Sequence, residues 1–298
     1  MEFTGFSEIN TERLKFKGPG FWYCEVALTG QCNFNCKYCN RFRAEVDPYI
    51  FGKFIYQYKD TLRHVQITGG EPTLYPSIFS VVDFIKNKGI RCGLSTNGSA
   101  PLSFYKLLKA DMYSISLDDY DFNILEGRGY KDPSLIVDNI KELSKSNYVN
   151  VGLVVDSLNY NRLEEIIDFI LSLGVSDIKI SINTKDEITP IFSDRDYSKY
   201  PILDYRIKRF RKSLPMRGIP KGDNFKCELS KNDISIIGDE HYPCLVYARE
   251  GGKPIGTLNN NVYNDRLSWY NNHVPQKDNI CKKYCMDFKC EFNRSVIK

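Results

Sequence analysis

Three cysteines, Cys32, Cys36 and Cys39, lie close together in a C-x3-C-x2-C arrangement. Thiolates are soft ligands that suit iron-sulfur clusters, zinc or copper(I). Zinc sites usually join a C-x2-4-C pair to a distant second pair, whereas here three thiols share one short segment. Because a cluster is normally held by four thiolates, this segment predicts an iron-sulfur cluster in which one iron has no protein ligand and is open for chemistry.

A second group of cysteines lies near the C-terminal end of the sequence. Its members are Cys227, Cys244, Cys281, Cys285 and Cys290. Five cysteines in a short polar segment are poorly explained as core filling, so we expect a second metal site there. Cys24, by contrast, lies inside an apolar run and is expected to be a small buried core residue.

The segment Gly69-Gly70-Glu71-Pro72 is the next candidate for chemistry. Neither glycine has a Cβ, so a polar ligand could approach the backbone closely. Glu71 places a carboxylate beside them, which suits an ammonium group through charge-assisted hydrogen bonds. The alternative is a plain Gly-Gly turn with a solvated glutamate.

Further polar side chains follow the third, fourth and fifth expected strands. Ser95 and Asn97 can hydrogen-bond a hydroxyl or a carboxylate, although an Asn-Gly turn would explain the same residues. Asp118 and Arg128 either bind a ligand or pair with each other within the protein. Weaker candidates for lining the same pocket are Asp156 and Asn159.

Alternating strands and helices would position these residues. Strands are expected at residues 21–29, 64–68, 91–94, 112–117, 150–155 and 177–182, and helices at 48–58, 75–88, 101–109, 134–144 and 161–173. This alternation is typical of βαβ units around a parallel sheet. Six strands are too few for a closed eightfold barrel, so we predict an α/β fold with a partial (βα)6 TIM-like barrel. The candidate residues fall at its functional rim, the C-terminal ends of the strands.

The expected barrel covers residues 21–182. Residues 1–20 form an irregular lead-in, and residues 183–226 form a connector with room for one basic helix. Residues 227–298 form a small metal-binding domain that contains a β-hairpin, with strands at 233–237 and 241–246. The hairpin would bring Cys227 and Cys244 near one another.

Composition limits the partners and the compartment. The formal net charge of +4 is too small to require a nucleic acid or a membrane surface. We find no signal peptide and no apolar run long enough to span a bilayer. Ten cysteines without a secretory signal indicate a reducing compartment. We therefore expect a cytoplasmic protein that binds neither membranes nor nucleic acid.

The cysteine triplet, with aromatic Tyr38 just before its last cysteine, resembles the signature of the radical S-adenosylmethionine (radical SAM) superfamily. This resemblance implies a 4Fe-4S cluster whose fourth iron is chelated by the amino and carboxylate groups of S-adenosylmethionine. Reductive cleavage of that cofactor would release a 5'-deoxyadenosyl radical, which abstracts hydrogen from a substrate carbon. An electron donor such as flavodoxin or ferredoxin is an implied partner, and Tyr38 an implied cofactor-binding residue.

The same resemblance implies roles for the other rim segments. Residues 69–72 are similar to the motif that binds the methionyl amino group. Ser95 and Asn97 would contact the ribose or the methionyl carboxylate. Asp118 and Arg128 lie in segments similar to the SLD and RG segments of peptide-modifying members, and would also bind the cofactor or substrate.

The tail resembles the SPASM extension, or its shortened form called twitch, which holds auxiliary 4Fe-4S clusters. The C-x10-G-x5-C opening at Cys227, the Ile255-Gly256 segment and Trp269 carry this likeness. The full pattern ends in C-x2-C-x5-C-x3-C, whereas this chain ends in C-x3-C-x4-C.

The tail likeness implies one auxiliary 4Fe-4S cluster, since five thiolates cannot complete two. Cys227 and Cys244 would be ligands together with two of Cys281, Cys285 and Cys290. The spare cysteine would be structural or a hydrogen-atom donor to a substrate radical. A zinc site built from four of the same thiolates is the alternative.

The tail type favours a ribosomally synthesised peptide as substrate, modified by crosslinking, thioether formation or epimerisation. One alternative is radical modification of a nucleotide or sugar-derived small molecule. A second alternative is a zinc or iron-sulfur binding module without catalysis, which would leave Gly69-Gly70-Glu71-Pro72 unexplained.

Overall fold

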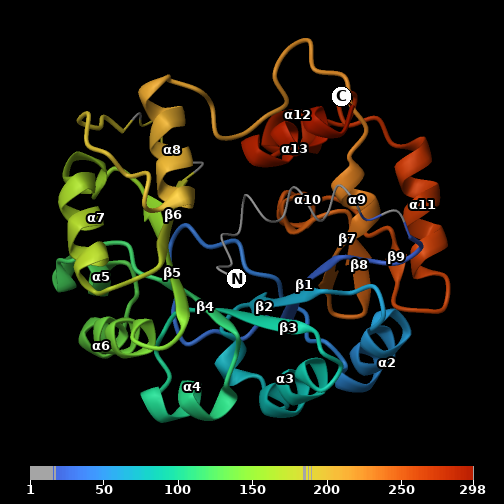
Figure 1. Cartoon of the computed structure of the whole chain (residues 1–298), viewed down its shortest axis with the longest axis horizontal. Helices are drawn as coiled ribbons and strands as arrows, with labels where there is room; N and C mark the ends of the chain where they lie inside the picture. The colour runs from blue at the N-terminus through green and yellow to red at the C-terminus, as the bar shows by residue number, and fades with distance from the viewer. Residues whose placement is uncertain (1–15, 17, 184–185, 187, 189, 298) are drawn as a thin grey trace. The chain divides into compact units, whose positions relative to one another are not determined.

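The computed structural model describes residues 16, 18–183, 186, 188 and 190–297, so most of the lead-in expected at residues 1–20 lies outside the described residues. The chain divides into two compact units, whose elements are labelled in Figure 1. The first unit holds residues 32–40 and 93–214. The second unit holds the described residues up to 31, residues 41–92 and the chain from residue 215 onwards. Each unit therefore combines stretches that lie far apart in the sequence.

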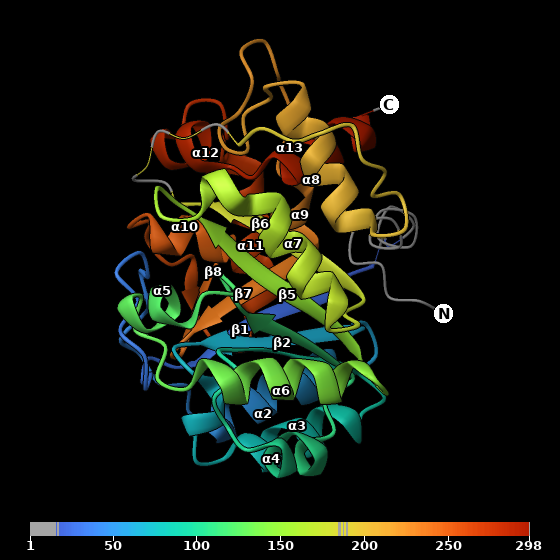
Figure 2. The same cartoon turned by 90° about the vertical axis from the view of Figure 1, so that its left-hand side faces the viewer.

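The first unit consists of parallel strands with helices packed against them. Its strands, in sheet order, are β3 (Arg91–Thr96, from residue 93 in this unit), β4 (Met112–Ser116), β5 (Tyr148–Val155) and β6 (Asp177–Ile182). Each neighbouring pair is parallel. The helices are α4 (Leu102–Leu108), α5 (Phe122–Gly127), α6 (Pro133–Ser144), α7 (Leu163–Ser172) and α8 (Pro201–Arg211), with a 3-10 turn, η2 (Tyr160–Arg162). Figure 2 shows this unit from the side on which α6 packs on β5, and α7 and α8 on β6.

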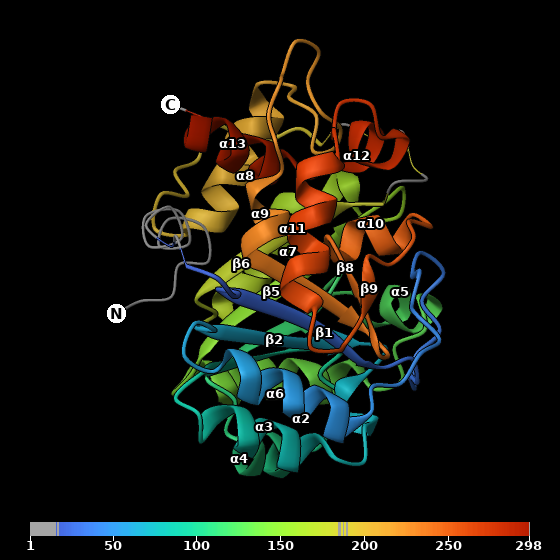
Figure 3. The ribbon, with the colours of Figure 1, turned by 90° about the vertical axis from the view of Figure 1, so that its right-hand side faces the viewer.

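The second unit contains a mixed sheet. Its strands, in sheet order, are β2 (His64–Gly69), β1 (Tyr23–Thr29), β7 (Asp233–Ile237), β8 (Glu240–Tyr242) and β9 (Gly256–Thr257). Strand β1 is parallel to both β2 and β7, whereas β8 is antiparallel to β7 and to β9. Figure 3 shows this unit with α2 and α3 packed together and α11 beside β9.

The helical elements of the second unit divide between its N-terminal and C-terminal stretches. The N-terminal ones are α2 (Pro48–Tyr58), the 3-10 turn η1 (Pro72–Leu74) and α3 (Ile78–Lys86). The C-terminal ones are α9 (Glu228–Asn232), α10 (Leu245–Arg249), α11 (Val262–Asn272), α12 (Asn279–Tyr284) and α13 (Asp287–Ile297). Among the described residues, no helix is long and apolar enough to cross a bilayer.

The predicted alternation of strands and helices is confirmed, with differences at the element ends. Helix α2 and strand β6 have the predicted bounds. Cys24 is fully buried in β1, opposite Val65 and Ile234 of the neighbouring strands, as predicted. The predicted basic helix in the connector is α8. Helix α5 and the tail helices were not predicted, because these segments are short or weakly periodic.

Two predicted boundaries were wrong for local reasons. The helix expected from residue 75 begins at Ile78, because Pro76 disfavours helical geometry at Tyr75, whose backbone is extended. The second hairpin strand, expected at 241–246, ends at Tyr242. It stops there because Cys244 caps α10, accepting a hydrogen bond from the Tyr247 N–H to its Sγ at 3.4 Å.

One buried arginine ties the tail elements together. Arg266 of α11 is fully buried, and its guanidinium donates to the Tyr242 carbonyl at 2.7 Å and to the carbonyls of Ser230 and Asp233. These three carbonyls terminate β8, lie in α9 and begin β7, respectively. Since buried backbone oxygens need hydrogen-bond donors, Arg266 fixes how α9 and the hairpin pack.

His241 lies in β8 and is fully buried. Burial, together with the positive charge of Arg266, lowers the pKa of His241 to about 3. The folded state therefore holds the imidazole neutral, whereas in the unfolded chain its pKa is about 6.5. Below that value the unfolded chain binds more protons than the folded chain, so stability falls as the pH falls towards 3.

We predict that His241→Gln reduces the pH dependence of stability. Between pH 7.5 and pH 5.5, the native protein should lose about 1.4 kcal/mol of unfolding free energy through this residue, and the variant should not. Urea denaturation at both pH values measures the difference. An equal loss in the variant and in the native protein would show that His241 does not titrate in this way.

Candidate metal centres

The cysteine triplet lies in the first unit on a segment without regular secondary structure. Its turn is closed by the Cys39 N–H, which donates to the Cys36 carbonyl at 3.1 Å. The thiol of Cys39 is exposed, and those of Cys32 and Cys36 are half-buried. Burial, then the charge of Asp118, raises the pKa of Cys36 to about 11. A metal must displace that proton, because the thiolate is the ligand.

Asp118 holds the triplet segment through Tyr38. It is fully buried after β4 and accepts a hydrogen bond from the Tyr38 hydroxyl. Its other oxygen accepts the Val154 N–H at 2.8 Å. Burial, followed by the charge of Asp118, raises the pKa of Tyr38, which keeps the phenol protonated as a donor. Thus the residue preceding the third cysteine is anchored to the ends of two strands.

Arg128 completes this support as a buried partner of two carboxylates. Its Nη1 lies 3.2 Å from Asp118, its Nη2 contacts Asp156, and 4% of its side chain is exposed. Burial raises the pKa of Asp118, and the charge of Arg128 opposes that rise. The sequence left open whether Asp118 and Arg128 bind a ligand or each other, and the observed contacts are those of the structural alternative.

Asn159 joins the same network. Its side-chain amide donates to the carbonyls of Asp118 at 2.8 Å and Val154 at 3.0 Å, and its side-chain oxygen accepts the Asp156 N–H at 3.0 Å. Asp156 and Asn159, the weaker sequence candidates, therefore support Asp118 and Arg128. The network links the ends of β4 and β5 to the triplet segment.

Asn97, after β3, contacts the start of the triplet segment. Its Nδ2 donates to the Asn33 side-chain oxygen at 2.8 Å and lies 4.0 Å from the Cys32 Sγ. Ser95 is half-buried in β3, in register with Ser114. Their predicted contacts with the cofactor stay predictions, and the structure adds for Asn97 a role in holding the triplet segment.

Gly129 follows Arg128 in the segment similar to the RG segment, and no separate role for it was predicted from the sequence. Its φ of +100° is one that L side chains rarely adopt, and a Cβ there would lie 3.2 Å from the Asn35 carbonyl carbon. The neighbouring Tyr130 ring packs on Phe34 at a centroid distance of 5.2 Å. The glycine beside Arg128 thus lets the backbone approach the triplet segment closely.

The Gly69–Pro72 segment lies in the second unit, after β2. The Gly70 N–H donates to the Thr29 carbonyl and the Glu71 N–H to the Gln31 carbonyl, both at 2.7 Å. A Cβ on Gly70 would lie 2.1 Å from the Gln31 carbonyl oxygen. The bare glycine backbone therefore packs against the end of β1, and close approach explains the glycines directly.

Glu71 is fully buried, and its carboxylate accepts the Thr73 N–H at 3.0 Å. Pro72 then begins η1. Glu71 is thus a fixed carboxylate rather than the solvated side chain of the alternative reading. Its predicted contact with an ammonium group stays a prediction.

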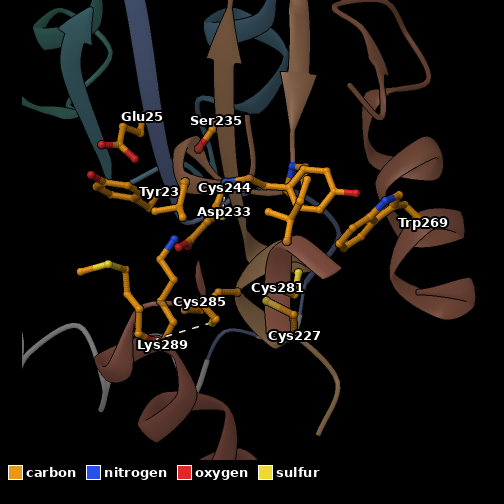
Figure 4. Close-up of a pocket in the computed structure, with 16 residues that line it drawn as sticks. Tyr23, Glu25, Cys227, Asp233, Ser235, Cys244, Trp269, Cys281, Cys285 and Lys289 are labelled. Atoms are coloured by element: carbon orange, nitrogen blue, oxygen red, sulfur yellow. Dashed lines mark hydrogen bonds between the residues drawn. The ribbon is translucent and has the colours of Figure 1, made fainter. Parts of the chain in front are cut away.

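Four tail cysteines line one cavity in the second unit, as Figure 4 shows. They are Cys227, Cys244, Cys281 and Cys285. They come from separate places in the chain: two precede α9 and α10, one lies in α12, and one follows it. Since the first two flank the hairpin, the predicted proximity of Cys227 and Cys244 is confirmed.

Cys290 does not line this cavity, but its thiol lies beside that of Cys285, and their hydrogen bond raises the pKa of Cys285. Cys290 is fully buried in α13, and its thiol lies 3.7 Å from the Gly218 carbonyl oxygen. Of the two roles expected for a spare cysteine, this position suits the structural one. A hydrogen-atom donor would need access to a substrate.

The four cysteine thiols that line the cavity are suitable ligands for a metal group. Burial, then neighbouring Cys285 and Cys244, raises the pKa of Cys227 to about 12. Burial, Asp278 and the neighbouring thiols likewise raise the pKa of Cys281. The charges of the neighbouring thiolates contribute to both shifts, and a metal group bound by these residues would remove that repulsion. The residues present therefore fit a four-thiolate metal group.

Two polar residues that lie beside these thiols were not predicted from the sequence to belong to the site. Lys289 of α13 lines the cavity. Burial lowers the pKa of its ammonium group, but the negative charges of Cys244 and Glu25 outweigh this effect, so the pKa is raised. His273 follows α11, and its Nε2 lies 3.5 Å from the Cys281 Sγ. Neither belongs to a spacing pattern that would mark it in a sequence.

Comparison with known proteins gives the following likenesses. A family model described as the radical SAM superfamily matches residues 26–170. The "tungsten-containing aldehyde ferredoxin oxidoreductase cofactor-modifying protein" of Pyrococcus furiosus is 24% identical over 254 residues, covering 76% of this chain and 71% of that protein. A "probable GTP 3',8-cyclase" of Sulfurisphaera tokodaii is 27% identical over 170 residues, covering 52% of this chain and 54% of the cyclase. The chain thus spans about half the length of that relative.

Solved structures share the fold. Streptococcus suis SuiB bound to S-adenosylmethionine superposes with a TM-score of 0.62 at 15% identity, covering 89% of this chain and 72% of SuiB. The structure titled "native anSMEcpe with bound AdoMet and Kp18Cys peptide" gives a TM-score of 0.60 at 14% identity, covering 93% of this chain and 84% of that one. These likenesses confirm the predicted α/β fold class, a partial barrel of parallel strands with a C-terminal antiparallel hairpin region.

We predict that Asp118→Ala lowers the unfolding free energy by roughly 3–5 kcal/mol, because it leaves the Arg128 charge buried with one partner removed. The matched control is Asp168→Ala in the same unit, whose pair with Arg195 is exposed and worth about 0–1 kcal/mol. Urea denaturation of both variants measures the difference. Equal losses would contradict the structural role of Asp118.

Proposed function

Because the chain belongs to the radical SAM superfamily and is a radical SAM enzyme, we propose that it modifies a ribosomally synthesised peptide by abstracting hydrogen from a peptide carbon. The outcome would be a crosslink, a thioether or an epimerised residue. The family implies a 4Fe-4S cluster and S-adenosylmethionine, which when bound supply a 5'-deoxyadenosyl radical. In the proposal, the rest of the chain binds, orients and shields the reacting groups.

Cys32, Cys36 and Cys39 would hold the cluster that binds S-adenosylmethionine. The contacts that support this assignment are those that fix the segment, from Tyr38 to Asp118 and from Asn97 to Asn33. The three thiols lie on one short segment, without a fourth cysteine nearby in the sequence.

The cofactor contacts proposed for other residues differ in their support. Glu71, with Gly69, Gly70 and Pro72 around it, would receive the methionyl ammonium, and its burial supports a fixed position. Ser95 and Asn97 would bind the ribose or the carboxylate. For Asp118 and Arg128 the support for direct contact is weaker, since each already pairs with the other.

Cys227, Cys244, Cys281 and Cys285 would hold one auxiliary 4Fe-4S cluster, in a tail domain of the SPASM or twitch type at residues 227–298. The observation that carries this proposal is the shared cavity of these four thiols. Four thiolates are also a complete zinc site, so zinc is the competing occupant.

The peptide substrate is supported by the tail and by the structures that share the fold. SuiB has been solved bound to its precursor peptide SuiA, with a TM-score of 0.61 to this chain, and anSMEcpe with a bound peptide. Tyr23, Glu25 and Ser235 line the same cavity as the four thiols, so in this proposal they would lie beside the auxiliary metal group.

A small-molecule substrate is the second candidate. Six sequence relatives are described as probable GTP 3',8-cyclases, at 27–31% identity over 166 to 194 residues. These matches favour a nucleotide, or a molecule derived from one. A non-catalytic metal-binding module is not retained, because the chain is a radical SAM enzyme.

The proposal includes an electron donor such as flavodoxin or ferredoxin, since reductive cleavage of S-adenosylmethionine consumes an electron. It also includes a cytoplasmic location, where thiols stay reduced. Nucleic acid is not part of the proposal, because the net charge of +4 is small.

We predict that the reduced enzyme with S-adenosylmethionine changes a peptide encoded beside its own gene and leaves GTP intact. A crosslink or thioether lowers the peptide mass by two hydrogens, and epimerisation in deuterated water replaces one carbon-bound hydrogen with deuterium. Mass spectrometry of both substrates measures the outcome, with Cys36→Ala as the inactive control. Consumption of GTP with an unchanged peptide would reject the peptide proposal in favour of the small molecule.

A further inference from the structure

Three side chains of different chemistry meet at the edge of the tail cavity. They are His273, which follows α11, Asp278, which precedes α12, and Cys281 within α12. One ligand atom from each lies within 4.8 Å of the other two. Imidazole, carboxylate and thiolate are the three donor types that zinc accepts.

The distance between the His273 nitrogen and the Cys281 sulfur suits two ligands of one ion. The His273 Nε2 and the Cys281 Sγ are 3.5 Å apart. With usual zinc bonds to sulfur and nitrogen and a tetrahedral angle, two such ligands lie about 3.6 Å apart. An ion could therefore be bound by both atoms with little movement of either side chain.

The imidazole of His273 is held in place by aromatic rings. It stacks on Trp269 with a centroid distance of 3.9 Å and an interplanar angle of 17°, and the Tyr247 ring meets it edge-on at 6.3 Å. Its backbone N–H donates to the Trp269 carbonyl at 2.8 Å. The stacking fixes the ring plane, which reduces the entropy lost when a ligand atom is ordered.

Asp278 is fixed by two hydrogen bonds. One carboxylate oxygen accepts the Cys281 N–H at 2.8 Å, and the other accepts the Tyr247 hydroxyl at 3.2 Å. Each carboxylate oxygen has a second lone pair, so both contacts leave room for a metal bond. These hydrogen bonds orient the carboxylate. In metal sites generally, hydrogen bonds from neighbouring residues orient the ligands in the same way.

We propose that His273, Asp278 and Cys281 form a mononuclear site for a zinc-class divalent cation, which shares only Cys281 with the four-thiol set. Three protein ligands leave a fourth position, as in zinc sites that bind water or substrate. Since Cys281 also lines the four-thiol cavity, the cation and a four-thiolate group compete for it. The site itself needs neither Cys227 nor Cys285, and it goes beyond the proposed function, on which it does not rest.

The test uses the full chain, freed of metal without oxygen, with Co2+ as the probe. The variant carries Cys32→Ser, Cys36→Ser, Cys39→Ser, Cys227→Ser and Cys285→Ser, so that neither of the other cysteine sets binds the probe. We expect one Co2+ per chain, with the visible bands of four-coordinate cobalt and charge transfer from a single thiolate. Adding His273→Gln or Asp278→Asn should weaken binding by more than about 100-fold, because loss of an outer contact already costs 10- to 100-fold. His64→Gln, in β2, is the matched histidine control and should bind Co2+ normally.

The proposal is overturned if this variant keeps its native circular dichroism but binds no Co2+, or binds it equally well with His273→Gln. If this variant does not fold, Cys36→Ser/Cys285→Ser serves in its place, and the same dependence on His273 is required. In either case the iron content of the native protein is unaffected, so failure of this site is distinguishable from failure of the auxiliary cluster.

Discussion

The buried carboxylate of Asp118 is the contact on which the first unit's chemistry depends. The triplet segment has no helix or strand to fix it, so its geometry must come from side chains. Asp118 binds the Tyr38 hydroxyl on one side and Arg128 on the other. Asn159 in turn holds the Asp118 backbone. A buried ion pair costs desolvation free energy. Here the pair holds in place the turn that carries the three thiols.

The second unit must instead bring together several thiols whose ionised forms repel one another. Cys227 and Cys244 are placed by short helices on either side of the β7–β8 hairpin, while Cys281 and Cys285 come from α12 and its end. Arg266 fixes the first pair by binding carbonyls of α9, β7 and β8. The thiols are thus preorganised, and binding of a metal supplies the charge that makes their proximity favourable.

Much of the fold followed from periodicity, since β1, α2, β2 and β6 have clear apolar patterns. Other features arise from long-range contacts that a local pattern cannot contain. Strand β7 pairs with β1, although more than two hundred residues separate them. The position of Cys290, beside Cys285 but not lining the cavity, depends on the path of α13. The sequence could mark Asp118 and Arg128 and offer their pairing as one alternative, but only the folded chain shows that they pair and that Gly129 packs against Asn35.

The central claim is that the chain holds two separate iron-sulfur centres, one on the triplet and one on four tail thiols. Iron content after anaerobic purification tests it most directly. The account predicts about eight irons per chain, about four in Cys36→Ala, and about four in Cys244→Ala/Cys281→Ala. A native protein with about four irons and one zinc, whose irons are lost in Cys36→Ala, would contradict the auxiliary cluster and favour zinc in the tail.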